Sequence, residues 1–347
     1  MLECNSMKKA KEQTNNDGPV MGFWADLKKP FFVLAPMADV TDAAFRQMIA
    51  KYSRHGEPGG GPDVFWTEFV SADGLCSQGR EVLLRDLAFT EREHPIVAQI
   101  FGSHPEHMRQ TAALVKELGF DGIDINMGCP DKSIEKQGAG AAHIKDPKLA
   151  QEVIRAVMEG AGGLPVSVKT RVGYNKEDLE GWLGAILETK PAVITVHART
   201  RKELSLVPAR WELVKRAKEL AEGTGTLIIG NGDVQDLADA QAKADASGAD
   251  GVMIGRGVFG TPWLFDRART TPPTLAEKFE IMIEHTHLYE KLLGDIKNFA
   301  IMKKHYKAYV NGFDGAKELR VQLMDAKNAD EIEGIAREFL KTHNIDN

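Results

Sequence analysis

The sequence has few cysteines, which limits the folds it can adopt. Only three occur in 347 residues, Cys4, Cys76 and Cys129, and no two are spaced as a pair. This spacing excludes a disulfide framework and a zinc-binding cysteine motif. Free cysteines are typical of a reducing compartment, so we expect a cytoplasmic protein, and we predict no metal site.

Long apolar runs and an excess of basic residues are also missing. No apolar run approaches the ~20 residues that cross a bilayer, so no membrane partner is expected. The N-terminus lacks the apolar core of a secretory signal and the arginines of a mitochondrial presequence. We expect residues 1–28 to form a flexible tail. The net charge of −6 weakly disfavours a nucleic-acid partner, although a local basic surface can override the total.

What the sequence does contain is a regular alternation of short apolar runs with longer helical stretches. The runs are rich in β-branched residues and almost continuously apolar, as strands covered on both faces must be. Eight strands, each followed by a helix, predict an α/β fold of the (β/α)8 TIM-barrel type over residues 29–268. The expected strands span residues 31–37, 63–70, 95–102, 122–128, 165–172, 193–199, 225–233 and 251–257.

The helices between these runs carry recognisable end signals. Residues 105–119 repeat apolar side chains every three or four positions, and Gly119 is typical of a helix C-terminus. Asp146 and Pro147 predict a helix start before residues 148–160. The helix of the second unit, between Gly74 and Pro95, has no clear pattern.

The pattern changes after Trp263. Residues 271–274, Thr-Pro-Pro-Thr, are typical of a linker, and no strand pattern follows. The remaining chain therefore predicts a small all-helical C-terminal domain over residues 274–347. Its amphipathic stretches are residues 275–293, 299–312 and 329–343.

Candidate site residues, most of them polar, gather where the predicted strands end. In a TIM barrel the carboxyl ends of the strands build the active site, so these residues should face one another. They are Pro36, Met37 and Ala38 after the first strand, Gln99 in the third, Asn126 and Cys129 at the fourth, Lys169 and Arg171 in the fifth, His197 and Arg199 in the sixth, Asn231, Gly232 and Asp233 in the seventh, and Gly255 and Arg256 in the eighth.

The glycine-rich turns after the last two strands indicate an anion site. Glycine allows backbone N–H groups to approach a phosphate, and TIM barrels often bind phosphate at this location. Alone, Asn231-Gly232-Asp233 is more typical of a plain tight turn. Together with Gly255-Arg256 and an inward Lys169, it favours a phosphorylated cofactor.

Eight segments together resemble the tRNA dihydrouridine synthase family. They are APMADVTDAAFR (35–46), TEFVSADGL (67–75), DGIDINMGCP (121–130), KQGAGAA (136–142), VKTR (168–171), HART (197–200), NGD (231–233) and DGVMIGRG (250–257). The resemblance spans roughly residues 31–265, and the helical tail is similar in kind to the second domain of that family.

The resemblance implies FMN as cofactor and NADPH as reductant. Pro36, Met37 and Ala38 would lie beside the flavin ring, and Gln99, Lys169 and His197 would reach its polar edge. Asn231, Gly232, Asp233, Gly255 and Arg256 would hold the phosphate. A cation at Lys169 suits this role because it stabilises negative charge on the reduced flavin.

The resemblance also assigns Cys129 as the proton donor. Hydride would reach C6 of a uracil while Cys129 protonates C5 from the other face. A thiol with an ordinary pKa of ~8.5 is protonated at neutral pH, as this role requires. By base rate such a cysteine is more often a small buried hydrophobe, but a Gly-Cys-Pro turn at the catalytic face should expose it.

A uracil in folded RNA must be flipped out of its stack to react. We expect Asn126 to contact its edge and Arg171 and Arg199 to hold nearby phosphates. In the tail, Lys303 and Lys307 share a helix face, and they are candidate contacts to the tRNA backbone. Other members of the same basic surface would be Lys297, Lys304 and Arg320, close to His305, Tyr306 and Tyr309.

Two segments depart from the family pattern. Residues 205–211 read SLVPARW where a tyrosine, a glycine and an acidic residue usually precede the tryptophan, and His143 replaces a usual aliphatic residue.

An alternative function is an FMN-dependent reductase of a free pyrimidine or another small enone, which has no need of a basic helical domain. A third alternative is a flavoprotein that mainly assists tRNA folding. The presence of Cys129 and Lys169 argues against this alternative, because these residues indicate that catalytic activity is retained. We expect a monomer without an obligatory protein partner.

Overall fold

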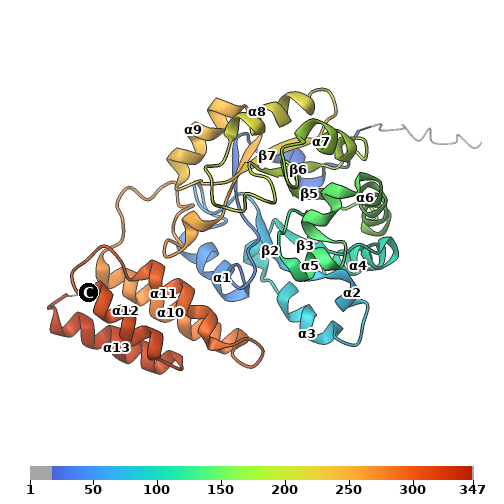
Figure 1. Cartoon of the computed structure of the whole chain (residues 1–347). Helices are drawn as coiled ribbons and strands as arrows, with labels where there is room; N and C mark the ends of the chain where they lie inside the picture. Colours follow the sequence, from blue (N-terminus) through green and yellow to red (C-terminus); the bar gives the residue numbers. More distant parts are fainter. Residues whose placement is uncertain (1–17, 346–347) are drawn as a thin grey trace, which may run out of the picture.

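The computed structural model describes residues 18–345, and its centre is a closed barrel of eight parallel strands (Figure 1). The strands pair in the order β1-β8-β7-β6-β5-β4-β3-β2. A parallel bridge between Val33 and Val64 joins the two ends of this sheet. The strands are β1 (Phe31–Leu34), β2 (Phe65–Ser71), β3 (Ile96–Phe101), β4 (Gly122–Met127), β5 (Val166–Arg171), β6 (Val193–His197), β7 (Leu227–Asn231) and β8 (Gly251–Ile254). All eight strand predictions, and the fold class, are confirmed.

These strands are apolar on both faces because both faces are covered. All six residues of β3 and of β4 are buried. Outward side chains such as Ile123 and Ile125 pack under the surrounding helices, whereas inward ones such as Phe31, Trp66 and Met253 form a separate cluster. This arrangement explains the nearly continuous apolar runs in the sequence.

Helices surround the barrel in the expected alternation. Asp146 caps α6 (Pro147–Ala161) by accepting a hydrogen bond from the Leu149 backbone N–H at 3.1 Å, and Gly119 follows α4 (Pro105–Glu117) with φ +86°. After β2 a single helix is replaced by short pieces, which is why the sequence there had no clear period. The helices of this part are α1 (Ala43–Tyr52), α2 (Ala72–Leu75), α3 (Arg80–Leu84), α4 (Pro105–Glu117), α5 (Lys132–Lys136), α6 (Pro147–Ala161), α7 (Leu179–Leu187), α8 (Trp211–Leu220) and α9 (Leu237–Ser247). Short 3-10 helices are η2 (Arg85–Leu87), η3 (Glu91–Glu93), η4 (Gly140–Lys145) and η5 (Arg256–Val258).

The prediction of a flexible tail over residues 1–28 is wrong for its last residues. Residues 1–17, with Cys4, lie outside the described part, but a 3-10 helix, η1 (Gly22–Asp26), precedes the barrel. Trp24 is buried, and its ring lies 5.7 Å from that of Phe31 and 5.8 Å from that of Trp66. The segment therefore covers the inner apolar cluster at the end of the barrel opposite the active-site face, a role that its polar composition conceals.

The C-terminal helices gather on one side of the barrel, beside α1 (Figure 1). They are α10 (Leu275–Leu293), η6 (Phe299–Met302), α11 (Lys303–Tyr309), α12 (Ala316–Asp325) and α13 (Ala329–Thr342). Thr274 and Glu277 form a capping box at the start of α10. The three predicted helical stretches are confirmed, and α12 is an additional helix. No helix within residues 18–345 has the length and apolar character needed to cross a membrane.

Candidate active site

A cavity of about 710 Å³ opens at the carboxyl ends of β6, β7 and β8. Its lining brings together six of the residues predicted to bind cofactor, which are His197, Asn231, Gly232, Asp233, Gly255 and Arg256, together with Arg199, Ser205, Val234, Gln235 and Gly257. The strand ends thus place these side chains around one space, as the sequence predicted from their positions alone.

Glycine is required in the turn after β7. Gly232 has φ +127°, and a Cβ there would lie 2.8 Å from the Ala209 Cβ. Gly257, after β8, is equally confined, since its Cβ would lie 2.6 Å from the Gln235 carbonyl oxygen. A side chain at either position would clash with neighbouring protein atoms, so glycine keeps the backbone of these two cavity-lining turns in place, which suits a phosphate cradle.

Two arginines at the cavity share one carboxylate. Asp233 accepts a hydrogen bond from Arg256 at 3.0 Å and another from Arg199, and the Arg199 hydrogen bond holds the pKa of Asp233 below its ordinary value. Arg256 is otherwise exposed, with 67% of its side chain accessible. The pair carries a net positive charge, so an anion is favoured here, with the Asp233 side chain orienting the arginines rather than facing the anion.

Lys169 on β5 and His197 on β6 lie close enough together for the Lys169 charge to act on the His197 ring, although the strand register pairs them with Thr195 and Arg171. The Lys169 ammonium donates to the Asn231 side-chain oxygen at 3.3 Å, and burial followed by the charge of Arg171 lowers the pKa of Lys169 to about 8. Burial and the surrounding cations keep the pKa of His197 well below its ordinary value. The His197 ring is therefore neutral, and its Nε2 accepts from Arg199 at 3.2 Å, so the ring proton resides on Nδ1.

A buried chain of hydrogen bonds leads to Cys129. The Gln99 amide donates to Asp124 at 2.6 Å, and the Asn126 amide donates to the Gln99 oxygen at 3.1 Å. The Asn126 oxygen in turn accepts the backbone N–H groups of Gly128 at 3.1 Å and of Cys129 at 2.9 Å. The Asn126 oxygen thus holds the turn that carries Cys129, while one N–H of its amide is fixed by Gln99.

Asp124 is a member of this chain that the sequence analysis did not single out. It is completely buried, and it also accepts from the Ser167 hydroxyl at 2.6 Å. Burial raises the pKa of Asp124 to about 6. A charged residue inside an otherwise apolar run, DGIDINMG, was the available signal.

The Cys129 thiol is partly buried on a small apolar cluster of Phe101, Ile134 and Ala139. Burial raises the pKa of Cys129, partly opposed by a hydrogen bond from the Asp131 backbone N–H. Gly140, with φ +60°, allows the following loop to close over the Cys129 carbonyl, since a Cβ there would lie 2.8 Å from that oxygen. The thiol is therefore protonated at neutral pH and can give up a proton.

Arg171 and Arg199 make more contacts with the protein backbone than the sequence suggested. Arg171 is buried, and it donates to the carbonyls of Gly128 at 2.8 Å, Thr200 at 3.1 Å and Leu204 at 3.1 Å. Arg199 donates to the Val207 carbonyl at 2.6 Å. Both guanidinium groups thus fasten loops around the site.

A second set of contacts around Cys129 escaped the sequence analysis. Arg201 pairs with Glu135 of α5 and donates to the Pro130 carbonyl at 3.3 Å. The Tyr174 ring lies 4.6 Å from the Lys145 ammonium and 5.5 Å from the Arg201 guanidinium. These pairs join segments distant in sequence, and no local pattern encodes them.

The loop of Pro36, Met37 and Ala38 lies against the same face. The Met37 N–H donates to the Thr41 hydroxyl at 2.9 Å, and the Met37 sulfur lies 3.5 Å from the Cβ position of Gly255. The loop therefore lies next to Gly255 of the cavity wall on the β1 side, although Pro36, Met37 and Ala38 are not among the residues that line the cavity.

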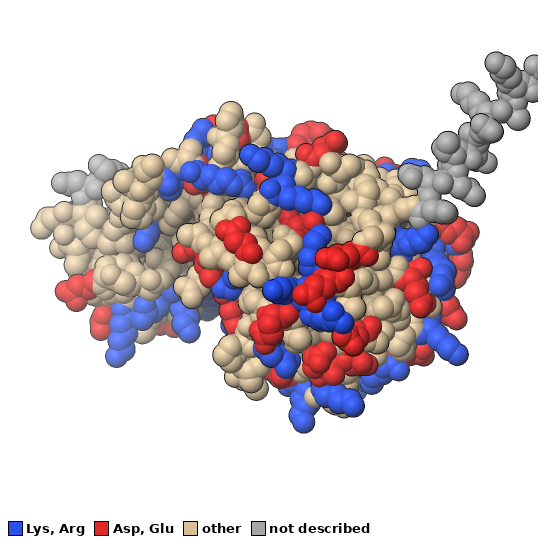
Figure 2. Space-filling model, turned by 90° about the horizontal axis from the view of Figure 1, so that it is seen from above, with Lys and Arg blue, Asp and Glu red and all other residues tan. Residues whose placement is uncertain are grey.

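The basic residues of the helical tail do not form one surface. Lys297 is buried in ion pairs, the Lys303 ammonium donates to the Met324 carbonyl, and Arg320 donates to the Val310 carbonyl at 2.7 Å. The neighbouring His305, Tyr306 and Tyr309 are core residues. Of these four lysines and one arginine, only Lys304 and Lys307 are exposed. On the face shown in Figure 2, Lys and Arg are interspersed with Asp and Glu.

Comparison with known proteins gives consistent results. The family model described as Dihydrouridine synthase (Dus) matches residues 33–344. The chain is 41% identical over 322 residues to "Probable tRNA-dihydrouridine synthase" of Staphylococcus aureus (strain Mu50 / ATCC 700699), covering 91% of this chain and 95% of that protein. It is 40% identical over 322 residues to "Probable tRNA-dihydrouridine synthase 2" of Bacillus subtilis (strain 168), covering 91% and 96%.

Solved structures show a similar fold at low sequence identity. A 2-naphthoyl-CoA reductase complex superposes with a TM-score of 0.51 at 12% identity, over 68% of this chain and 49% of that chain. Histamine dehydrogenase from Rhizobium sp. 4-9 superposes with a TM-score of 0.50 at 14% identity, over 74% and 48%. At this identity the likeness concerns the fold alone.

Proposed function

Since the chain belongs to the dihydrouridine synthase family, it is an oxidoreductase, and we propose that it reduces the C5–C6 double bond of specific uridines in tRNA. Family membership implies flavin-dependent reduction. We propose FMN as the bound flavin and NADPH as its reductant. Residues 29–268 would form the catalytic unit and residues 274–347 the tRNA-binding unit of a cytoplasmic monomer.

The observation that carries this proposal is the cavity at the ends of β6, β7 and β8. It combines two glycine turns that exclude side chains with two arginines that share a single carboxylate. These features fit the phosphate of FMN. The Lys169 ammonium has a neutral partner, Asn231, as its nearest hydrogen-bond acceptor, which fits the negative edge of a reduced flavin.

The residues of the chain would provide the proton and position the substrate. A bound flavin would supply the hydride. Cys129 holds the proton for C5 on a thiol whose pKa burial raises, and Asn126 fixes the Cys129 backbone. We propose that Arg171 and Arg199 support the substrate-facing loops and also contact phosphates of the tRNA. We propose that Asn126 contacts the edge of the uracil in addition to supporting Cys129.

The competing function, reduction of a small enone, is less well supported. The relatives named for tRNA match over 91% of the chain, a length that includes the helical tail. The relatives therefore favour tRNA over a small enone as the substrate.

Cofactor extraction and single-turnover kinetics test the proposal. We expect FMN to be released on denaturation, NADPH to reduce it, and unmodified tRNA to reoxidise it faster than free uridine does. A protein that takes up no flavin would overturn the proposal, and one whose flavin is reoxidised only by a small enone would favour the alternative.

A further inference from the structure

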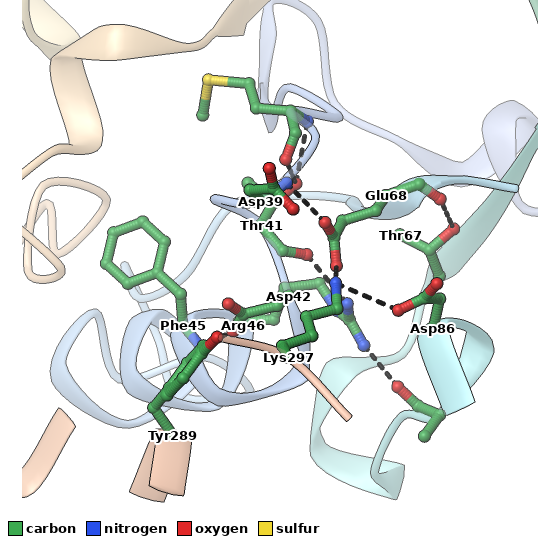
Figure 3. A network of polar contacts seen from close by, with 12 residues as sticks. Asp39, Thr41, Asp42, Phe45, Arg46, Thr67, Glu68, Asp86, Tyr289 and Lys297 are labelled. Atoms are coloured by element: carbon green, nitrogen blue, oxygen red, sulfur yellow. Dashed lines mark hydrogen bonds and ion pairs between the residues drawn. The ribbon is translucent and has the colours of Figure 1, made fainter. Parts of the chain in front are cut away.

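A buried ion-pair network joins the helical tail to the barrel at the loop before α1 (Figure 3). Lys297, in the turn that follows α10, extends its ammonium to the barrel. It lies 2.7 Å from a Glu68 carboxylate oxygen on β2 and 3.0 Å from Asp86 in η2. The Lys297 and Glu68 side chains are 14% and 7% exposed, so water screens this pair far less than a surface pair.

Glu68 reaches this position because β2 is irregular there. The register between β2 and β3 shifts between Trp66 and Phe69, and the Thr67 hydroxyl bridges the irregularity by donating to the Glu68 carbonyl at 2.8 Å and accepting the Gln99 N–H at 3.1 Å. A bulge of this kind redirects a side chain that would otherwise follow the strand's alternation.

The two carboxylate oxygens of Glu68 serve two different segments. One accepts from Lys297, and the other accepts the Asp39 backbone N–H at 2.6 Å. Asp39 has φ +54°, a left-handed backbone conformation that few residues other than glycine adopt, and the hydrogen bond to Glu68 helps to hold it. Figure 3 shows Glu68 between Lys297 and Asp39.

Asp39 belongs to the turn that places Met37. Val40 and Thr41 donate their N–H groups to the Met37 carbonyl at 3.1 and 3.0 Å, and Arg46 holds the Thr41 carbonyl at 2.9 Å. The Met37 sulfur in turn borders Gly255 in the cavity. A continuous set of contacts therefore runs from the helical tail to the cavity edge.

We propose that Lys297 is a positioning residue, which acts through Glu68 to hold the 36–41 loop in the conformation that borders the cavity. The ammonium neutralises Glu68, whose charge would otherwise stand beside Asp86 and the buried Asp42, and so keeps its second oxygen on the Asp39 N–H. That this loop faces the flavin ring rests on the proposed function; that Lys297 orders it does not. The helical tail thus contributes to the geometry of the barrel's active site.

The first test needs no cofactor. In Lys297→Met, hydrogen exchange at the Asp39 amide should accelerate by about tenfold or more, because its acceptor is no longer held in place. Glu68→Gln, a milder change, should also accelerate it. The matched control is Lys51→Met, which removes an exposed tail-to-barrel ion pair with Glu284, 2.6 Å long, that does not touch Glu68. Lys51→Met should leave the Asp39 amide unchanged.

The second test uses the FMN-loaded protein. Lys297→Met should change the visible circular dichroism of the flavin and lower kcat for tRNA reduction by about tenfold, with KM for tRNA within about twofold. The double variant Glu68→Gln/Lys297→Met leaves no unpaired Glu68 charge, and it should lose no more than the worse single variant. If Lys297→Met does not fold, Glu68→Gln and the double variant decide.

Unchanged exchange at Asp39 in both Lys297→Met and Glu68→Gln would overturn the inference, as would an equal effect of Lys51→Met. Failure of the proposed function gives a different result. A wild-type protein without flavin or tRNA reduction, in which Lys297→Met still accelerates exchange at Asp39, would contradict the proposed function and leave the positioning role intact.

Discussion

Asp42, the residue that caps α1, is a carboxylic acid in a site that disfavours its charge. One oxygen accepts the Phe45 N–H at 2.9 Å, and the other has no hydrogen-bond partner among residues 18–345. Burial, and then the nearby charge of Glu68, raises the pKa of Asp42 to about 7, while Lys297 and Arg46 act in the opposite direction. A pKa raised above the unfolded value of 3.8 means that Asp42 favours folding while it is protonated.

This contribution to stability is fully present below pH 3.8 and is lost as the pH rises towards about 7. Asp42→Asn keeps the helix cap and removes the titration. We expect its free energy of unfolding, relative to wild type, to increase with pH by up to roughly 1.4 kcal/mol per unit across this window, and to level off above it. Urea denaturation at pH 5 and pH 8 measures the difference. A difference that does not change with pH, or that shrinks, would contradict this assignment.

Single residues also show how far the sequence could predict the site. Asn126 and Arg171 were placed at the active-site face from their position at strand ends, and they lie there. Their hydrogen bonds to the Gly128 backbone depend on the folding of the turn, which no spacing in the sequence encodes. Lys297 was predicted as part of a basic surface for tRNA, and its partners Glu68 and Asp86, more than 200 positions away, could not be found from the sequence.

Among the elements, the turn after β7 shows most directly how backbone conformation shapes the candidate site. Gly232 combines φ +127° with a neighbour, Ala209, that leaves no room for a Cβ. Gly223 also has positive φ, +74°, but nothing lies within 4 Å of its Cβ position. Substitutions at these two glycines therefore distinguish the effect of an unfavourable backbone conformation from the effect of steric crowding.

We expect Gly232→Ala to lower both the melting temperature and the affinity for FMN. Strain of this kind costs roughly 1–3 kcal/mol, and contact with Ala209 adds to it. Gly223→Ala should have only the smaller loss of stability and normal FMN affinity. Calorimetry and a fluorescence titration with FMN measure the two effects. Equal melting temperatures and equal FMN affinities for the two variants would show that the turn does not form the cradle.

Element prediction succeeded where the pattern was long and failed where an element was short. The eight strands and α10 were predictable because burial on both faces, or a long amphipathic face, leaves a regular trace. The helix α12 buries Leu319 and Leu323 at helical spacing but follows a glycine-rich turn that conceals its start. In η1 the only buried side chain is that of Trp24. A single tryptophan in a polar segment produces no repeating apolar pattern, so the sequence could not predict this helix.

For the whole molecule, the contacts of individual cations matter more for tRNA binding than the net charge does. The chain carries a net charge of −6, and four of the five tail cations predicted to form a basic surface, Lys297, Lys303, Lys304 and Arg320, already have partners. Lys307 of α11 is exposed and makes no hydrogen bond or ion pair with another described residue, whereas its helix neighbour Lys303 is tied to α12. These two residues were predicted together as tRNA contacts, and they should now differ in effect.

Lys307→Glu should weaken tRNA binding and reduce the slope of log K against log salt by about one phosphate contact. Its melting temperature should stay at the wild-type value. Lys215→Glu makes the same charge change on the exposed face of α8 and should leave binding unchanged. Fluorescence anisotropy at several salt concentrations separates the two. A loss of binding that is equal in both variants would indicate a general effect of net charge and not a contact at α11.

The central claim is that this chain reduces uridine in tRNA with Cys129 as the proton donor. Mass spectrometry of unmodified tRNA, incubated with purified protein, FMN and NADPH, tests it most directly, with Cys129→Ala as the comparison. We predict a gain of two hydrogens on specific uridines with the wild-type protein. In Cys129→Ala this gain should be lost, while FMN binding and NADPH oxidation persist. Unmodified uridine after incubation with a wild-type protein that binds FMN and oxidises NADPH would contradict the account.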